Sequence, residues 1–385
     1  MRLGSDRLFA SSRLDHASVG VVCNPSSVDQ ELQLLADRIV AARRARLAAI
    51  FGPQHGFRSE VQENMIESHH ARDERRRVPV YSLYSETREP TAEMLRGIDV
   101  LVIDLQDVGT RIYTYIYTMA NCLIAARKHG LKAIVCDRPN PIGGISVEGP
   151  MLSPGFESFV GQYPIPMRHG MTIGELARLF NEAFGIGADL EVFAMDGWHR
   201  EMYFDDTDVP WVMPSPNMPT LDTAIVYPGS VLFEGTNISE GRGTTRPFEL
   251  VGAPWACAEG LAEAMNSLKL PGVRCRPVVF EPTFHKHAKR ACGGCQIHVF
   301  DREAFCAVET GVALVKALRA CGPDHFAWRQ PPYEYEYHKL PFDILAGSTE
   351  LREQIEAGLG AKAIASSWLP AVGAFMDLRS QFLLY

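Results

Sequence analysis

Four polar side chains with acid, amide and guanidinium chemistry follow one short apolar run in this chain. The run Val100–Ile103 is continuously apolar, which is typical of a strand buried on both faces. Asp104, Gln106, Asp107 and Arg111 come directly after it. In an open α/β sheet, ligands bind in the crevice outside the carboxyl ends of the strands. We therefore interpret Asp104–Arg111 as the floor of an active site.

Other apolar runs end in the same way. Their ends carry Asn24, then Gln54 and His55, then Glu86, and finally Asp137, Arg138 and Asn140. One polar strand end would carry little weight. Together with Asp104–Arg111, five successive strand ends are polar. They predict a shared cleft, because the carboxyl ends of parallel strands meet at one edge of a sheet.

The segments that position these residues alternate between strands and helices. We expect strands at Ser18–Cys23, Leu47–Phe51, Val80–Tyr84 and Lys132–Cys136, and helices at Leu32–Ala45, Thr91–Arg96 and Thr172–Phe184. Thr172 and Glu175 have the spacing of a capping box. Residues 198–254 are rich in Pro and Gly and predict a long ordered loop region. The alternation predicts an α/β fold with a parallel sheet covered by helices on both faces.

A second, smaller α+β domain is expected after residue 254. Its predicted elements are a helix at Ala256–Leu268, strands at Val273–Phe280 and Gln296–Phe300, and helices at Ala304–Ala320 and from Glu350 onward. Cys292 and Cys295 have CxxC spacing, but two further zinc ligands are missing nearby, so we interpret this segment as a glycine turn before a strand.

Composition excludes several classes of protein. The 385 residues carry a formal net charge of −8, which argues against a nucleic-acid surface. Charged residues interrupt the N-terminus, and no apolar stretch approaches the roughly 18 residues of a membrane span, so neither a secretory signal nor a membrane partner is expected. Nine cysteines, several inside predicted strands, indicate free thiols in the cytoplasm. Neither a G-x-G-x-x-G nor a Walker A motif is present, so we expect no nucleotide cofactor.

Two kinds of hydrolytic chemistry remain. His69-His70 and His285-Lys286-His287 could hold a metal, but no carboxylate stands at the spacing of an H-E-x-x-H motif, so a metal hydrolase is the minor alternative. Glycoside hydrolysis needs two carboxyl groups across one bond. The carboxylates on predicted loops and strand ends are Glu60, Glu86, Asp104, Asp107, Asp137, Glu148 and Glu240. Each of them could equally belong to a structural ion pair.

Long motifs in the chain resemble the DUF1343 family, whose characterised branch is the NamZ-type exo-β-N-acetylmuramidases. They are GPQHGFRSE (52–60), PVYSLYSET (79–87), IDVLVIDLQDVGTRIYTYIYTM (98–119), DRPNPIGG (137–144), VEGPML (147–152), PIPMRHGMTIGELA (164–177) and NISEGRGTTRPFE (237–249). The resemblance implies a Rossmann-like N-terminal domain, a smaller α+β C-terminal domain and an active-site cleft between them. We place the domains at residues 15–230 and 231–385.

The resemblance also implies an activity, namely removal of N-acetylmuramic acid from the non-reducing end of peptidoglycan fragments without a metal or other cofactor. The family pattern PEHG reads Pro53-Gln54-His55-Gly56 here, so one of its two glutamates is an amide. Glu86 matches the other and is the predicted general acid/base. Gln54 cannot transfer a proton as a carboxylic acid does. Glu60 could take its place, or the substrate's own acetamido group could assist with Gln54 in support, or this chain could act on another sugar.

The resemblance assigns a sugar-binding role to a larger set. His55, Arg58, Asp104, Gln106, Asp107, Arg111, Tyr113, Asp137, Arg138 and Asn140 form the expected floor, and His169, Asn217, Glu240 and Arg242 reach in from junction loops. An arginine suits the lactyl carboxylate of muramic acid because its planar fork matches a carboxylate. Tyr113, Tyr115 and Tyr117 cannot all face the sugar. The alternatives are a non-catalytic sugar-binding protein and a hydrolase for a different amino sugar. Oligomeric state and anomeric outcome are not specified by the sequence.

Overall fold

The N-terminal half folds around a seven-stranded sheet. The computed structural model describes residues 1–63 and 65–385. In the order in which they pair, the strands are β3 (Ala71–Asp73), β4 (Val78–Ser82), β2 (Arg46–Gly52), β1 (Ser18–Val22), β5 (Val100–Ile103), β6 (Lys132–Cys136) and β9 (Asp189–Phe193). All neighbouring pairs are parallel except β3 and β4. The predicted mostly parallel α/β sheet is confirmed, and chain order reverses at β1, where β2 and β5 lie on opposite sides.

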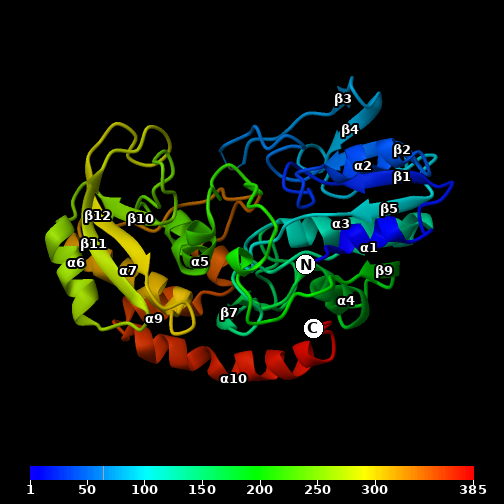
Figure 1. Cartoon of the computed structure of the whole chain (residues 1–385). Helices are drawn as coiled ribbons and strands as arrows, with labels where there is room; N and C mark the ends of the chain where they lie inside the picture. Colours follow the sequence, from blue (N-terminus) through cyan, green and yellow to red (C-terminus); the bar gives the residue numbers. More distant parts are fainter. Residues whose placement is uncertain (64) are drawn as a thin grey trace.

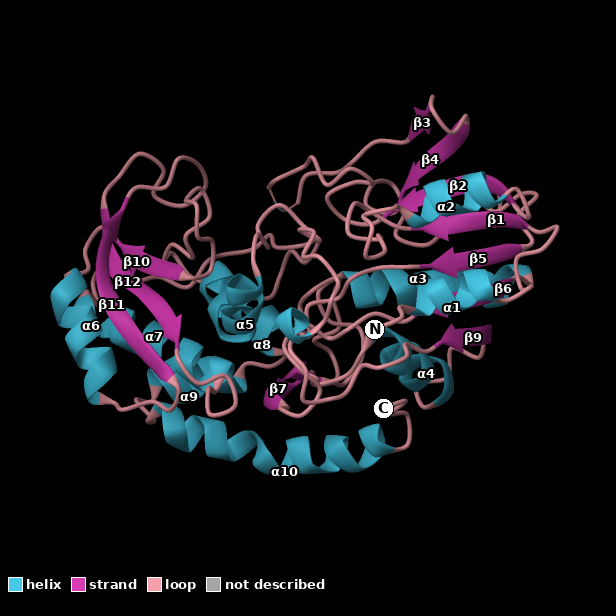
Figure 2. Cartoon of the chain, viewed as in Figure 1, coloured by secondary structure: helices cyan, strands magenta, loops and turns pink. Residues whose placement is uncertain are grey.

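Helices cover both faces of this sheet (Figures 1 and 2). Val100 and Val102 of β5 pack with residues of α1 (Gly4–Ala10) and α2 (Leu35–Ala42) on one face. Leu101 and Ile103 belong to the core on the other face, which includes α3 (Tyr115–His129) and α4 (Ile173–Glu182). All four β5 side chains are therefore buried, which is why the strand is continuously apolar. Burying each such side chain contributes roughly 1.5–3 kcal/mol.

The start of α4 follows the expected capping box. The Thr172 hydroxyl accepts from the Glu175 backbone N–H, and the Glu175 carboxylate accepts from the Thr172 N–H at 3.0 Å. The Asp137 carboxylate at the tip of β6 also accepts from the Gly174 N–H at 2.7 Å. These bonds satisfy N–H groups that the first turn of a helix leaves without partners.

A smaller sheet forms the core of the C-terminal part. Its order is β10 (Leu250–Ala253), β12 (Cys292–Val299) and β11 (Val273–Phe280), all antiparallel. Helix α6 (Ala258–Ser267) packs on this sheet, and α7 (Ala307–Cys321) packs on α6. The expected glycine turn between Cys292 and Cys295 is wrong, because both cysteines lie inside β12. Gly293 is required there since a Cβ would lie 2.0 Å from the Ala256 carbonyl oxygen.

Helices and loops join the two sheets. They include the hairpin β7 (Glu148–Met151) and β8 (Pro166–Arg168), the short helices η1 (Phe204–Asp206) and η2 (Val231–Gly235), and α5 (Leu221–Ser230), α8 (Pro341–Ala346), α9 (Glu350–Glu356) and α10 (Ala361–Ser380). Helix α10, red in Figure 1, runs from the C-terminal part back to the N-terminal one, and it packs on both α7 and β7.

Two further expectations about elements are wrong, and two edge strands were missed. Residues 91–96 form turns rather than a helix, since so short a segment gains too few hydrogen bonds to offset helix nucleation. The region 198–254 contains α5 and β10, although its Pro and Gly content had predicted a long loop. Strands β3 and β9 at the sheet edges were not expected. Their side chains are mostly exposed or partly exposed, so they give no continuous apolar run.

The last residue, Tyr385, forms hydrogen bonds with residues just after the ends of two strands of the main sheet. The Tyr385 hydroxyl donates to the Asp137 carboxylate at 2.7 Å and accepts from the Met195 N–H at 2.6 Å. Tyr385→Phe is expected to lower the free energy of unfolding by about 1–3 kcal/mol, because it removes a hydrogen bond to a buried carboxylate. Urea unfolding measures this, with Tyr337→Phe as the control because Tyr337 is exposed. Equal stabilities of the two variants would contradict the prediction.

Candidate active site

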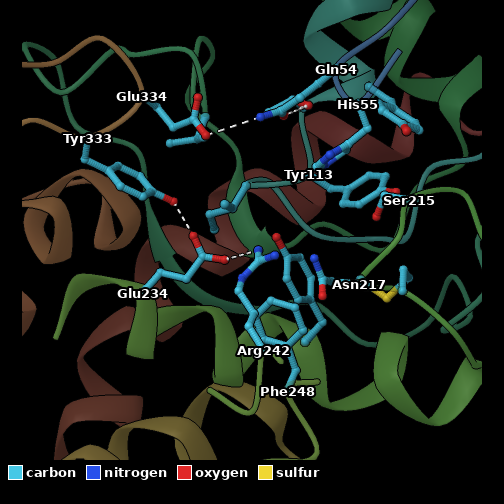
Figure 3. A pocket seen from close by; sticks show the side chains of 16 residues that line it. Gln54, His55, Tyr113, Ser215, Asn217, Glu234, Arg242, Phe248, Tyr333 and Glu334 are labelled. Carbon is cyan, nitrogen blue, oxygen red and sulfur yellow. Dashed lines mark hydrogen bonds and ion pairs between the residues drawn. The ribbon is translucent and has the colours of Figure 1, made fainter. Parts of the chain in front are cut away.

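A narrow cavity lies between the two halves of the chain, outside the carboxyl end of β2. It encloses about 470 Å³ of empty space, counting its mouth. Residues 54–160 contribute Gln54, His55, Ile112, Tyr113, Thr114, Tyr115 and Val160, and residues 215–334 contribute Ser215, Asn217, Met218, Tyr227, Glu234, Arg242, Phe248, Tyr333 and Glu334. Figure 3 shows Glu334 and Tyr333 across the cavity from Gln54 and His55. The carboxyl groups of Glu334 and Glu234 and the amide of Gln54 thus line the same cavity.

Glu334 is a carboxyl group buried in the wall of this cavity. Its Oε1 accepts from Gln54 Nε2 at 3.2 Å, and its Oε2 accepts from the Tyr84 hydroxyl at 2.7 Å. Burial, reinforced by the negative charge of Glu234, raises the pKa of Glu334 to about 7, although the two hydrogen bonds act in the opposite direction. A carboxylic acid that keeps its proton near neutral pH can serve as a general acid.

A strained turn presents Glu334 to the cavity. The backbones of Tyr333 and Glu336 exchange hydrogen bonds of 2.9 Å, and the two residues between them, Glu334 and Tyr335, have φ angles of 45° and 67°. Asn and Gly are the usual residues in such a turn because L side chains are strained at positive φ. Strain of this kind costs about 1–3 kcal/mol per residue and is concentrated at functional sites.

Glu234 and Arg242 form an ion pair on the same side of the cavity. Arg242 Nη2 donates to Glu234 Oε1 at 2.7 Å, and the Tyr333 hydroxyl donates to Glu234 Oε2 at 2.7 Å. The Arg242 guanidinium also lies 5.0 Å from the centre of the Phe248 ring. Although burial alone would lower it, the pKa of Arg242 is raised by Glu234 and by Glu240. The pair holds a negative and a positive charge in the wall of the cavity.

Gln54 and His55 follow β2 and keep fixed orientations. Gln54 Oε1 accepts from the Thr114 hydroxyl at 2.8 Å, while its Nε2 donates to Glu334, so both ends of the amide are oriented. His55 Nδ1 lies 2.7 Å from the Val61 carbonyl oxygen, which requires the proton on Nδ1. Burial lowers the pKa of His55 to about 4, so the ring is neutral at pH 7. Neither side chain can supply a proton at that pH.

The three alternating tyrosines separate as expected. Tyr113 and Tyr115 line the cavity, with their rings 4.8 Å apart, whereas Tyr117 lies in the hydrophobic core. Asn217 also lines the cavity and donates through Nδ2 to the Gln62 carbonyl at 2.9 Å. The structure thus brings together Gln54, His55, Tyr113, Asn217 and Arg242 from the predicted set.

The polar ends of β5 and β6 hold the protein together instead of lining this cavity. Asp104 accepts from Arg138 at 2.9 Å, and Arg138 also donates to Gln106. Arg111 is fully buried and donates to four backbone carbonyls, those of Pro150, Ile165, Leu345 and Ala346. Both Nη atoms of Arg111 thus donate to the backbone, whereas its Nε is buried without a hydrogen-bond partner. The backbone contacts explain the position of this charge without a ligand.

The remaining members of the predicted floor have similar internal contacts. Asp107 Oδ2 accepts from the Gly109 N–H and lies 3.2 Å from His169 Nε2. Asn140 donates to the Met171 carbonyl. Asp137 accepts from Thr172, Gly174 and Tyr385, and burial raises its pKa to about 7.

Three predicted residues lie on the surface. Glu86 is exposed and lines an open groove next to the cavity, not the cavity itself. Arg58 and Glu60 are exposed and line a separate hollow beside β4. Glu240 is buried behind Arg242. Burial alone would raise the pKa of Glu240, but Lys286, His285 and Arg242 hold it well below its usual range.

Sequence reasoning missed the two carboxylates of the cavity. Glu234 lies just before the motif at residues 237–249, from which only Glu240 and Arg242 were predicted to contact the sugar. Glu334 lies in the segment Tyr333-Glu334-Tyr335-Glu336-Tyr337, where the accumulation of tyrosine and glutamate was the one available signal. Their position against Gln54 arises from folding, since 280 residues separate Gln54 from Glu334.

The alternative metal ligands have other partners. His285 Nδ1 lies 3.2 Å from Glu240 Oε1, and His287 Nε2 lies 2.6 Å from the Asn237 carbonyl oxygen. Within residues 1–63 and 65–385, no group of three or more His, Cys, Asp or Glu side chains is arranged to hold a metal ion. None of the helices in this described part is both long and apolar enough to cross a membrane.

Comparison with known proteins gives consistent matches over the whole chain. Residues 19–222 match the family model described as "Exo-beta-N-acetylmuramidase NamZ, N-terminal", and residues 225–385 match the corresponding C-terminal model. The chain is 47% identical to the "Peptidoglycan beta-N-acetylmuramidase NamZ" of Bacillus subtilis (strain 168), covering 100% of this chain and 91% of that protein. The predicted boundary between residues 230 and 231 stays a prediction.

Two solved structures share the fold. Both are DUF1343 family proteins of Bacteroides fragilis NCTC 9343. The first has a TM-score of 0.90 at 35% identity, and the second has a TM-score of 0.77 at 27% identity. Each alignment covers 100% of this chain and 98% of the other.

Proposed function

The chain belongs to the NamZ exo-β-N-acetylmuramidase family, and from this premise we propose that it removes N-acetylmuramic acid from the non-reducing end of peptidoglycan fragments, with Glu334 as the general acid. The observation that carries the assignment of Glu334 is its position. It is a buried carboxyl group with a pKa raised to about 7, held by Gln54 in the cavity between the domains.

The opposite environments of the two carboxylates support different roles. Among the described residues, the hydrogen-bond donors to Glu334 are an amide and a phenol, and neither is cationic. Glu234 is paired with Arg242, and both of its oxygens accept bonds of 2.7 Å. We assign Glu234 to stabilising the positive charge that develops on the sugar ring, because oxygens held in this way are poorly placed to attack carbon.

The reaction then uses the substrate's own acetamido group. Its oxygen forms a bond to C1 while the bond from C1 to the glycosidic oxygen breaks, and the Glu334 proton passes to that oxygen. Water next attacks C1 and releases the acetamido oxygen, and Glu334 accepts the proton of the water. Gln54 uses one Nε2 hydrogen to hold Glu334, and its second Nε2 hydrogen can orient the acetamido oxygen. This sequence needs no carboxylate at position 54.

The remaining predicted residues keep narrower roles. His55, Tyr113, Asn217 and Arg242 line the cavity and are proposed to contact the terminal sugar. The acid/base roles predicted for Glu60 and Glu86 stay predictions, and their exposed positions favour Glu334. All nine cysteines are unpaired, which supports a reducing compartment, and we propose the cytoplasm.

Turnover of two isomeric disaccharides tests the proposed function. We expect release of N-acetylmuramic acid from N-acetylmuramyl-β-1,4-N-acetylglucosamine and no cleavage of the isomer with N-acetylglucosamine at its non-reducing end. Mass spectrometry of the products measures both. Binding of the first disaccharide without turnover would indicate the sugar-binding alternative. Cleavage of the isomer alone would indicate a hydrolase for a different amino sugar.

A further inference from the structure

The turn that carries Glu334 separates the cavity from a second, larger hollow. This open groove contains about 1350 Å³ of empty space, against about 470 Å³ in the cavity. Glu334 lines both, whereas Ser85–Glu89, Phe159 and Tyr335 line only the groove. We propose that the groove is the leaving-group subsite, which binds the saccharide on the reducing side of the scissile bond and favours an uncharged sugar there.

The proposal rests on the assignment of Glu334 as the acid. A general acid must lie within hydrogen-bond reach of the glycosidic oxygen that it protonates. That oxygen joins the terminal sugar to the rest of the substrate, so the two parts must extend to opposite sides of Glu334. The narrow cavity can take only a chain end, and the open groove leaves room for a longer saccharide.

Aromatic rings and one arginine form a platform in the groove. The Arg88 guanidinium lies 4.2 Å from the centre of the Tyr335 ring, which lines the groove, and 4.7 Å from that of Tyr84, which is fully buried and does not line it. The Phe159 ring lies 5.2 Å from Tyr84, and Tyr335 is 41% exposed. Apolar sugar faces pack on exposed aromatic rings, while a guanidinium donates to sugar hydroxyls. Tyr84 also donates to Glu334, so the platform is directly connected to the acid.

The charged side chains around the platform determine whether it favours a neutral or an anionic leaving sugar. Glu67, Glu86, Glu89, Glu157 and Glu336 surround it, and Arg88 is the single cationic side chain that lines the groove in the described part of the chain. Lys128 and Lys339 pair with Glu89 and Glu336 from outside, and Arg88 lies 3.9 Å from Glu67. Excess negative charge remains at Glu86 and Glu157. An anionic leaving sugar would be repelled, whereas a neutral N-acetylhexosamine would not.

Two substrates that share the terminal sugar test the subsite. N-acetylmuramyl-β-1,4-N-acetylglucosamine would occupy the groove, whereas methyl β-N-acetylmuraminide, whose leaving group also needs a proton from Glu334, would not. Tyr335→Ala is expected to lower kcat/KM for the disaccharide about tenfold, through lost aromatic contact, and to change kcat/KM for the methyl glycoside by less than about twofold. Phe300→Ala is the matched control, because this exposed ring lies far from Glu334 in sequence and outside the groove lining.

The outcomes separate the subsite from the proposed function. Equal losses on both substrates, or no loss on either, would overturn the subsite. Failure of the unmodified protein on both substrates would instead overturn the proposed function.

The charge preference of the groove is tested by a second variant. Glu86→Lys is expected to raise kcat/KM about threefold for a substrate whose leaving saccharide carries a carboxylate, with the gain disappearing at high salt. A gain that is independent of salt, or absent, would contradict the charge preference.

Discussion

Glu334→Gln is expected to lower kcat/KM for N-acetylmuramyl-β-1,4-N-acetylglucosamine by roughly 10²–10⁴-fold, the contribution of a positioned general acid. Glutamine has the shape of the carboxylic acid and can still bond to Gln54 and Tyr84, but it has no proton to transfer. Initial rates of product release measure the loss. Glu263→Gln, on the exposed surface of α6, is the matched control and should retain full activity.

The same assignment predicts how activity depends on pH. Burial raises the pKa of Glu334 to about 7, and the acid must be protonated to act. Activity is therefore retained below pH 7 and falls as pH rises above it, by about tenfold per pH unit. Near-normal turnover in Glu334→Gln, or an unchanged alkaline limb in that variant, would contradict the acid role.

Arg242→Met is expected to destabilise the protein by about 3–5 kcal/mol, because it removes one partner of a buried ion pair. Arg242 donates to Glu234 at 2.7 Å, lies 3.4 Å from Glu240, and stacks on Phe248. Methionine keeps part of the packing on Phe248 but leaves the Glu234 carboxylate without the guanidinium. Urea unfolding measures the change in the free energy of unfolding.

A double variant distinguishes the ion pair from simple loss of packing. Glu234→Gln/Arg242→Met removes both charges and is expected to be more stable than Arg242→Met alone. If the second substitution adds further destabilisation of similar size, the two residues are not coupled, and the assigned pair is contradicted. Activity is expected to remain low in the double variant, since the charge assigned to stabilising the sugar ring is absent.

The sequence predicted the central elements well where one local pattern determines them. Strands β5 and β6 have the predicted bounds, because a strand buried on both faces needs a continuous apolar run. The capping box was also predicted correctly, because it depends only on Thr172 and Glu175, three residues apart. Edge strands such as β9 are partly exposed, so they have no continuous apolar run and their pattern resembles that of a loop.

The site was harder to predict because polar residues at strand ends have two possible roles. Arg111 and Arg138 stand at the expected edge of the sheet, yet both donate to backbone carbonyls, and Arg138 also donates to Asp104. Only the folded chain shows which charges are satisfied internally. Glu334 required tertiary information entirely, since a turn from the C-terminal part brings it to Gln54.

The position of Gln54 has a physical explanation in the structure. A glutamate at that position would place a second negative charge beside Glu334, 3.2 Å from its oxygen. The amide instead donates to Glu334 and accepts from Thr114, so it fixes the acid without competing for a proton. Gln54 is therefore a positioning residue for Glu334 in the proposed reaction.

The central claim, that Glu334 donates the proton to the leaving group, is tested most directly by the dependence of the Glu334→Gln defect on leaving-group quality. Dinitrophenolate leaves without help from an acid, whereas a sugar alkoxide needs a proton. We predict a loss in kcat/KM of at least about 100-fold on the disaccharide and of less than about tenfold on 2,4-dinitrophenyl β-N-acetylmuraminide. Equal losses on the two substrates would contradict the assignment of Glu334 as the general acid.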